Sequence, residues 1–216
     1  MEDRSQQFWE EKLRVYNTKS WIDQPSIFVQ EVVKYFPHDG DVLELAAGQG
    51  QDSRFLAKQG YKVTCTDRSD FGLAEARRKA DIDGVHIHFM KVDLAKSLPF
   101  ADGRFDVVYA HMGLHYFTKE YTRDLFEEIS RVLKPGGIFA GIFNTNKDPE
   151  IIANGLEKIE DNYYYEKETG LKKRYFSIED VGFFIEGLLE PLVLDEDGRT
   201  YKDGDLGLVR LIARKS

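Results

Sequence analysis

Segments typical of β-strands alternate with segments typical of α-helices through the middle of this 216-residue chain. Short apolar runs predict five strands, at residues 41–45, 61–67, 86–92, 105–110 and 138–143. Helical patterns fill three of the intervening stretches, at residues 50–59, 71–82 and 119–134. Because parallel strands need a long crossover connection, this order predicts a parallel sheet with helices on both faces.

Two flanking regions complete what we expect to be one α/β domain that spans all 216 residues. Residues 1–40 predict a helical cap, and residues 144–189 predict a polar, helical lid that holds the substrate. Residues 191–194 and 206–213 predict two more strands within the terminal segment 190–216. No crossover helix fits between these two strands, so they should pair antiparallel as a hairpin.

Composition and charge narrow the functional classes. The net charge of −8 argues against a broad phosphate-binding surface and therefore against nucleic acid as the partner. The chain has no apolar run of about 18 residues and no basic, apolar secretion signal at its start, so we expect no membrane partner and a cytoplasmic location. The single cysteine, Cys65, excludes an internal disulfide, and we expect no metal site. The sequence leaves open whether the protein is a monomer or a homodimer.

A loop of small residues follows the first predicted strand and precedes a helix. The strand ends with Glu44 and Leu45, and the loop then contains Ala46, Ala47, Gly48 and Gly50. Small residues allow the backbone to approach a ligand closely, and the following helix directs its positive dipole end toward that ligand. Such a loop alone is common among α/β proteins and does not specify the ligand.

Two acidic residues make the prediction more specific. Asp67 ends the second predicted strand, and Asp93 follows the third. Parallel strands end at one edge of a sheet, where ligands of open α/β sheets bind. A carboxylate beside the first loop can accept hydrogen bonds from a ribose diol, and the next carboxylate can accept them from an adenine amino group. The sequence therefore predicts a nucleoside site at this edge.

Together, residues 44–50, Asp67, residues 92–94, 105–109 and 133–137 resemble the successive motifs of class I S-adenosylmethionine-dependent methyltransferases. The resemblance covers roughly residues 40–143 and makes the segment 41–143 the donor-binding core. It implies a Rossmann-like fold with a seven-stranded, mostly parallel sheet and an antiparallel last strand, which the terminal hairpin would supply. The implied cofactor is S-adenosyl-L-methionine.

The resemblance also implies roles for individual residues. Glu44 would organise the loop near the methionine ammonium, and the small residues Ala46, Ala47, Gly48 and Gly50 would line the methionine part. Asp67 would hold the ribose hydroxyls, and Arg68 would pack at the adenine. Val92, Asp93 and the Leu94 amide would contact the adenine edge, and Ala110 and His111 would lie near the methyl group. Ala46 stands where the family has its first loop glycine.

Asp52 separates this interpretation from NAD binding, the alternative chemistry for the same fold. The NAD fingerprint needs a third glycine, which is missing after Gly48 and Gly50. Asp52 would also place a negative charge where a pyrophosphate should bind, whereas a sulfonium amino acid has no phosphate. Tyr16 and Trp21 are candidates to close over the donor, and core packing of the helical cap is an equal alternative.

The sequence says less about the residues that would bind the molecule that accepts the methyl group. His111, His115 and Tyr116 follow the fourth strand, and the two histidines are candidate bases. His115, Tyr116 and Tyr164, the last in a run of three tyrosines, are candidate substrate contacts. Residues 172–174 are interpreted as a solvated run of charges, with contact to an acidic substrate as the alternative. The leading hypothesis is methyl transfer to an O, N or S atom of a small molecule. RNA or protein methylation, an inactive donor-binding partner and an NAD-linked oxidoreductase are the alternatives.

Overall fold

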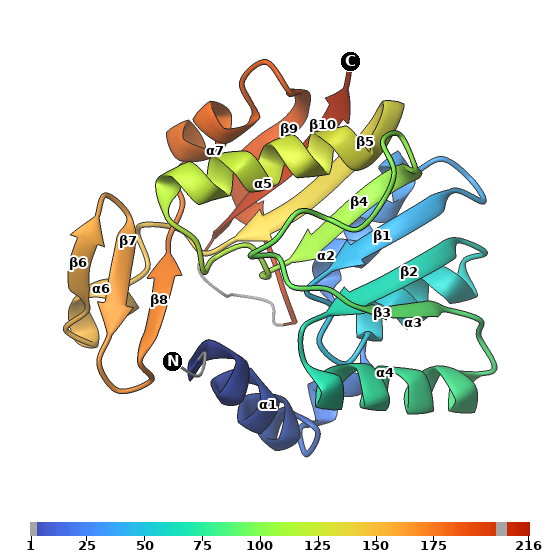
Figure 1. Ribbon diagram of the computed structural model, residues 1–216, viewed down its shortest axis with the longest axis horizontal. Helices are drawn as coiled ribbons and strands as arrows, with labels where there is room; N and C mark the ends of the chain where they lie inside the picture. The colour runs from blue at the N-terminus through green and yellow to red at the C-terminus, as the bar shows by residue number, and fades with distance from the viewer. Residues whose placement is uncertain (1–3, 202–206) are drawn as a thin grey trace.

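A seven-stranded sheet forms the centre of the computed structural model, which describes residues 4–201 and 207–216 (Figure 1). The strand order is β3-β2-β1-β4-β5-β10-β9. The strands are β1 (Asp41–Leu45), β2 (Lys62–Asp67), β3 (His88–Lys91), β4 (Phe105–His111), β5 (Leu133–Phe143), β9 (Leu189–Gly198) and β10 (Leu208–Lys215). Strands β1 to β5 run parallel, and β10 pairs antiparallel with both β5 and β9. The predicted mostly parallel sheet with an antiparallel last strand is therefore confirmed.

Helices cover both faces of this sheet. They are α1 (Arg4–Tyr16), α2 (Ile27–Val32), α3 (Gln51–Lys58), α4 (Asp70–Asp83), α5 (Lys119–Val132), α6 (Glu150–Ala153) and α7 (Ile178–Ile185), with short 3-10 turns η1 (Ser20–Asp23) and η2 (Val33–Tyr35). Phe126 of α5 and Phe184 of α7 belong to the hydrophobic core on one face. Phe28 of α2, Leu56 of α3 and Ala76 of α4 belong to the core on the other face. No helix within the described ranges is long and apolar enough to cross a membrane.

Hydroxyl side chains define where several helices begin. Ser26, Ser69 and Thr118 each accept a hydrogen bond from a backbone N–H in the first turn of α2, α4 and α5. Ser177 forms a capping box with Asp180 at the start of α7. These caps fix the exit points of the loops at the carboxyl edge of the sheet, where β2 passes into α4 and β4 passes toward α5.

The predicted helical lid is wrong for most of its length. Residues 157–174 form a separate three-stranded antiparallel sheet, β6 (Glu157–Glu160), β7 (Tyr163–Glu166) and β8 (Leu171–Arg174), which lies beside the carboxyl ends of the central strands (Figure 1). Only the short α6 precedes it, and α7 packs on the main sheet instead. Each of these strands has only four residues, and only Tyr163, Leu171 and Arg174 among them are buried, so apolar alternation is too weak to distinguish them from a polar helix.

The terminal hairpin has the predicted antiparallel pairing, with Leu211 opposite Leu194. Strand β9 is longer than predicted and begins at Leu189. Leu206 of the predicted last strand and residues 1–3 of the predicted cap lie outside the described residues. Strand β5 also begins earlier than predicted, at Leu133, so residues 135–137 lie inside it and do not separate α5 from the sheet.

Candidate active site

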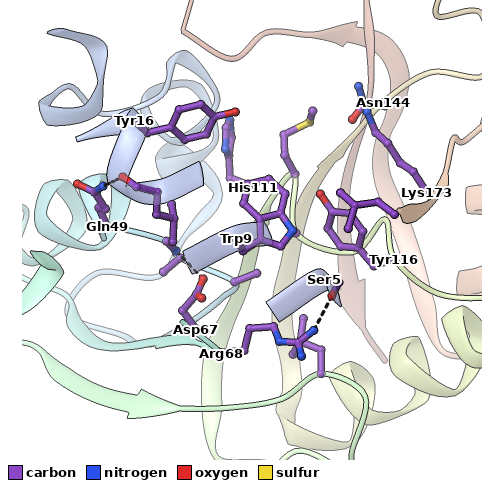
Figure 2. Close-up of a pocket in the computed structure, with 18 of the residues that line it drawn as sticks. Ser5, Trp9, Tyr16, Gln49, Asp67, Arg68, His111, Tyr116, Asn144 and Lys173 are labelled. Atoms are coloured by element: carbon purple, nitrogen blue, oxygen red, sulfur yellow. Dashed lines mark hydrogen bonds between the residues drawn. The ribbon is translucent and has the colours of Figure 1, made fainter. Parts of the chain in front are cut away.

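A cavity of about 890 Å³ opens at the carboxyl ends of the parallel strands. Its walls come from the strand ends, from α1 and η1, and from the edge of the β6–β8 sheet. In Figure 2, Gln49 and Asp67 lie on one side of this space and Lys173 and Asn144 on the other, with His111 between them. The predicted strand-end residues and the inserted sheet therefore face one common space.

The loop after β1 is shaped by residues in left-handed backbone conformation. Ala46, Gly48 and Gly50 have φ angles of 53°, 57° and 68°. Ala46, Ala47 and Gly48 line the cavity as predicted. Gly50 does not, because it lies where α3 packs on α4, and a Cβ placed there would be 3.0 Å from the Ala76 Cβ. The predicted ligand role of Gly50 is thus replaced by a packing role.

Asp67 is held in place by the backbone of two loops. Gly48 donates its N–H to Asp67 Oδ2 at 2.7 Å, and Ser69 donates its N–H to Oδ1 at 2.8 Å. The side chain is nearly buried, at 8% exposure, and this burial raises its pKa from the ordinary range. Asp67 lines the cavity, where its carboxylate can accept further hydrogen bonds.

Glu44 and Asp52 form a second acidic wall of the cavity. The Glu44 carboxylate accepts a hydrogen bond from the Ser53 hydroxyl, and burial together with the Asp52 charge raises its pKa well above the ordinary value. Asp52 accepts bonds from the Ser26 N–H at 2.7 Å, the Ser26 hydroxyl at 2.8 Å and the Tyr109 hydroxyl at 2.7 Å. Asp52 therefore also anchors α2 to the central sheet.

The residues predicted to contact the adenine follow β2 and β3. Val92, Asp93 and Leu94 line the cavity, as does Arg68. Arg68 donates a hydrogen bond from Nη1 to the Ser5 hydroxyl at 2.8 Å, which connects α1 to the loop after β2. Asp93 Oδ1 accepts a bond from the Ala95 N–H at 3.1 Å, so the turn after β3 orients this carboxylate.

Aromatic side chains cover the cavity from the N-terminal segment. Tyr16 and Trp21 line it as predicted, and their ring centroids lie 5.1 Å apart. Tyr201 joins them at 4.8 Å from Trp21 and is hydrogen-bonded to the Gln51 side chain. Sequence reasoning missed Tyr201, because it lies in the polar connection after β9 and no pattern marks it as a site residue.

The two candidate histidines differ in position. His111 lines the cavity, and its Nε2 is buried without a hydrogen-bond partner among the described residues. Burial lowers its pKa, so the imidazole is neutral at neutral pH and can accept a proton. His115 lies behind the wall at 1% exposure and accepts the Asn144 N–H at 2.8 Å. Burial lowers the pKa of His115 to about 3, so its predicted role as base or substrate contact is replaced by a structural one.

Two other predicted contacts are displaced by one position. Tyr116 lines the cavity as predicted, but Tyr163 lines it in place of Tyr164, whose ring packs against Tyr175 at 5.9 Å. Neighbouring residues of a strand face opposite sides, and of these two tyrosines only Tyr163 lines the cavity. Ala110 is likewise buried within β4 at 1% exposure and does not line the cavity. His111, Met112 and Gly113 form the wall there.

Residues 172–174 differ in exposure, and only Lys172 fits the predicted solvated run of charges. Lys172 and Lys173 line the cavity, and Arg174 is completely buried, paired with Glu160. Arg174 also donates to the Phe117 carbonyl at 3.1 Å and the Asp161 carbonyl at 3.2 Å. Arg174 thus fixes β8 against the loop after β4, and this brings the two lysines to the cavity. Sequence reasoning also missed Trp9 and Asn144, which line the same side.

Several buried polar atoms of the cavity wall lack partners among the described residues. They include Trp9 Nε1, Gln51 Oε1 and His111 Nε2. Such atoms are costly to bury unless a bound molecule or water completes their hydrogen bonds. The acidic residues at the strand ends suit a nucleoside that carries positive charge and no phosphate. The residues present therefore fit S-adenosylmethionine, and the fold and the cavity define a Rossmann-like nucleoside-binding domain.

Comparison with known proteins gives the family. Residues 42–137 match the family model described as a methyltransferase domain. The uncharacterized methyltransferase YbaJ of Bacillus subtilis (strain 168) is 31% identical over 188 residues, which cover 74% of this chain and 73% of the relative. The chain therefore belongs to the class I S-adenosylmethionine-dependent methyltransferases.

Other curated relatives are similar in sequence over a smaller share of their own length, and solved structures show a similar fold. The malonyl-[acyl-carrier protein] O-methyltransferase of Enterobacter lignolyticus (strain SCF1) is 29% identical over 68% of this chain and 53% of its own length. The chain spans about half the length of several curated relatives that it matches. The CcbJ methyltransferase of Streptomyces caelestis superposes with a TM-score of 0.75 at 19% identity, over 99% of both chains, and shows the same fold.

Proposed function

We propose that this chain transfers the methyl group of S-adenosylmethionine to an O, N or S atom of a small molecule. The observation that carries the proposal is the continuity of the cavity. The same space is lined by Asp67 and Asp93 at the strand ends, by Asn144 after β5 and by Tyr163 of the inserted sheet. A donor at the acidic end and an acceptor at the other would share one partly enclosed volume of about 890 Å³.

The residues at the strand ends would hold the donor. Asp67, fixed by two backbone N–H groups, would accept hydrogen bonds from the ribose hydroxyls. Asp93 and the Leu94 amide would contact the adenine edge, and Glu44 would organise the loop near the ammonium group. When bound, S-adenosylmethionine supplies a methyl group that a nucleophile can displace from its sulfonium sulfur.

The remaining residues would position the acceptor and control protons. Trp9 and Tyr116, with ring centroids 5.8 Å apart, cover the space beside His111 and would exclude water. Alignment of the acceptor within this cover would supply much of the catalysis. His111 is neutral at neutral pH, so it would accept a proton at a ring nitrogen when the acceptor atom carries one.

Calorimetric titration of the chain with S-adenosylhomocysteine and with NAD tests donor recognition. We expect saturable binding of S-adenosylhomocysteine and none of NAD, because the acidic wall of Glu44 and Asp52 disfavours a pyrophosphate. The opposite result would support the oxidoreductase alternative.

Incubation with S-adenosylmethionine labelled in its methyl group tests transfer. We expect label to enter the small-molecule fraction of a cell extract. Label in RNA or protein would point to those acceptors instead. Donor binding without transfer to any fraction would indicate an inactive donor-binding partner.

A further inference from the structure

The edge of the inserted sheet brings two lysines to the acceptor side of the cavity. Strand β8 is the outer strand of the order β6-β7-β8 and pairs only with β7 among the described strands. Residues 170–173, at or beside this strand, line the cavity, and Lys173 lies near Asn144 and Tyr116 in Figure 2. The burial of Arg174 and its bonds to the Phe117 and Asp161 carbonyls hold the strand in this place.

Neither lysine is neutralised at close range by a carboxylate. No hydrogen bond or ion pair joins Lys172 to another described residue, and the carboxylate oxygen nearest to Lys173 Nζ is Glu150 Oε2, 4.0 Å away. Lys173 is only 26% exposed. Lys134, which is also partly buried, lies closer to its partner, at 2.8 Å from Asp106 Oδ2. The acceptor side therefore carries two positive charges that a bound anion could pair with.

Aromatic side chains share the cavity with the lysines. Trp9, Tyr116, Phe117 and Tyr163 line it, and Lys173 Nζ lies 4.8 Å from the centroid of the Tyr175 ring behind the wall. The Trp9 Nε1 atom is buried and has no hydrogen-bond partner among the described residues, so it is a further donor available to a bound molecule. Glu44 and Asp67 at the strand ends, and Asp52 in the first turn of α3, line the donor side, where an anion would be repelled. On the acceptor side the two lysines face one carboxylate, Glu150, so this side keeps an excess of positive charge.

We propose that the acceptor is an anionic small molecule with an aromatic or apolar body. Its anionic group binds Lys172 and Lys173, and its body packs against Trp9 and Tyr116. This inference rests on the proposed methyl transfer, because it takes the acidic end of the cavity as the donor site. A carboxylate and a phosphate share the required chemistry, and the experiment separates them.

The test titrates benzoate, phenyl phosphate and the uncharged benzamide into the full chain saturated with S-adenosylhomocysteine. We expect at least one of the two anions to bind about tenfold more tightly than benzamide, and the better anion identifies the group. Replacement of either lysine, Lys172→Gln or Lys173→Gln, should weaken the binding of that anion about tenfold and leave benzamide unchanged. Increasing salt should weaken only the anion.

Lys158→Gln is the matched control, because Lys158 lies on the same small sheet, pairs with Asp161 at 2.6 Å and does not line the cavity. The Lys158→Gln variant should bind the anion with the same affinity as the wild type. Equal binding of the anions and benzamide, or lysine variants that bind the anion normally, would overturn the inference.

S-adenosylhomocysteine affinity is measured for every variant and should not change. If the wild type fails to bind S-adenosylhomocysteine, the proposed function fails. The anion titrations are then run on the chain alone, where loss of binding in both lysine variants still supports the basic site and normal binding overturns it.

Discussion

The carboxylate of Asp67 accepts a hydrogen bond from the backbone N–H of Gly48 at 2.7 Å. This bond joins the end of β2 to the loop after β1, and the Ser69 N–H holds the second carboxylate oxygen. One side chain therefore shapes the loop and presents negative charge to the cavity. A change at Asp67 should affect donor binding through both the charge and the loop.

Asp67→Asn tests this dual role. An asparagine has one acceptor oxygen, so it cannot accept both backbone bonds, and it removes the charge. We expect S-adenosylhomocysteine to bind at least about tenfold more weakly, which corresponds to about 1.4 kcal/mol, in a calorimetric titration. Asp81→Asn, an exposed position in α4, is the control and should bind normally. Near-normal affinity of Asp67→Asn would contradict the assigned role.

Glu44→Gln should make the protein more stable at alkaline pH while weakening donor binding. Burial and the Asp52 charge raise the pKa of Glu44, so the folded state holds this proton more tightly than the unfolded state. The resulting stabilisation is present below the ordinary glutamate pKa and is lost as pH rises through the raised value. Glutamine mimics the protonated form and avoids that loss.

Thermal unfolding from acid to alkaline pH measures the effect. At pH 8 we expect the Tm of Glu44→Gln to exceed that of the wild type by about 2–4 °C, and the difference to vanish toward pH 4. Glu75→Gln should show the opposite sign at pH 8, because the Arg78 hydrogen bond lowers the pKa of Glu75. A Glu44→Gln variant that is less stable than the wild type at pH 8 would refute the argument.

Gly113→Ala tests how closely the loops after β1 and β4 approach each other. A Cβ on residue 113 would lie 2.5 Å from the Ala46 Cβ, so one of the two loops must move. We expect a loss of about 1–3 kcal/mol in the free energy of unfolding, measured with denaturant. Ala46→Gly removes the opposing methyl group, and the double variant should recover part of that loss. Strict additivity of the two changes would show that the contact is not the cause.

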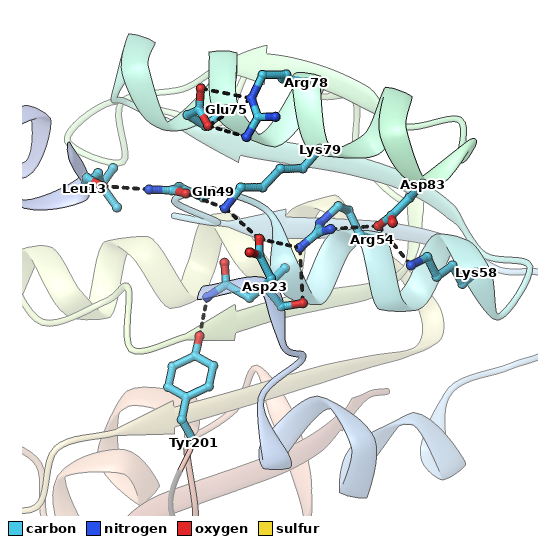
Figure 3. A network of polar contacts seen from close by, with 11 residues as sticks. Leu13, Asp23, Gln49, Arg54, Lys58, Glu75, Arg78, Lys79, Asp83 and Tyr201 are labelled. Carbon is cyan, nitrogen blue, oxygen red and sulfur yellow. Dashed lines mark hydrogen bonds and ion pairs between the residues drawn. The ribbon is translucent and has the colours of Figure 1, made fainter. Parts of the chain in front are cut away.

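Lys79→Met tests a polar network that holds the N-terminal segment over the cavity (Figure 3). Lys79 is nearly buried, donates to Gln49 Oε1 at 2.8 Å and pairs with Asp23 at 2.9 Å, while Gln49 donates to the Leu13 carbonyl at 2.7 Å. Removal of the amine leaves Gln49 Oε1 and Asp23 without this partner, at a cost of about 1–3 kcal/mol.

The expected result is faster amide hydrogen exchange in residues 13–23 and weaker S-adenosylhomocysteine binding, because Tyr16 and Trp21 belong to this segment. Arg78→Met is the neighbouring control. The Arg78 side chain pairs with Glu75 within α4 and forms no hydrogen bond to residues 13–23, so exchange in that segment should not change. Unchanged exchange in Lys79→Met would mean that packing of Leu13 alone holds the segment.

The sequence predicted the central sheet well because its strands and helices have strong periodic patterns. β1 and β4 are almost completely buried and therefore read as continuous apolar runs, and α5 carries a clear apolar stripe. The common position of the acidic residues could be predicted from the topology, because parallel strands place their carboxyl ends together. Asp67 and Asp93 accordingly line one cavity.

The acceptor side was harder to predict, because its residues meet only through tertiary contacts. Strand β8 contains Lys172, Lys173 and Arg174 in sequence, and nothing local shows that Arg174 is buried while the lysines line a cavity. His115 and Tyr164 were placed in the site from their neighbours in sequence. His111 and Tyr163 line the cavity, whereas His115 and Tyr164 do not. Which residue of each pair lines it depends on the direction of the side chain.

The position of β10 between β5 and β9 has a consequence for the order of folding. The ribosome makes β9 before β10, yet β9 reaches the central sheet only through hydrogen bonds to β10. Strands β1 to β5 can assemble while translation continues, whereas the edge of β5 stays open until residues 208–215 have emerged. We therefore expect nascent chains that stop after β9 to expose this edge and to be bound by chaperones more than the full chain.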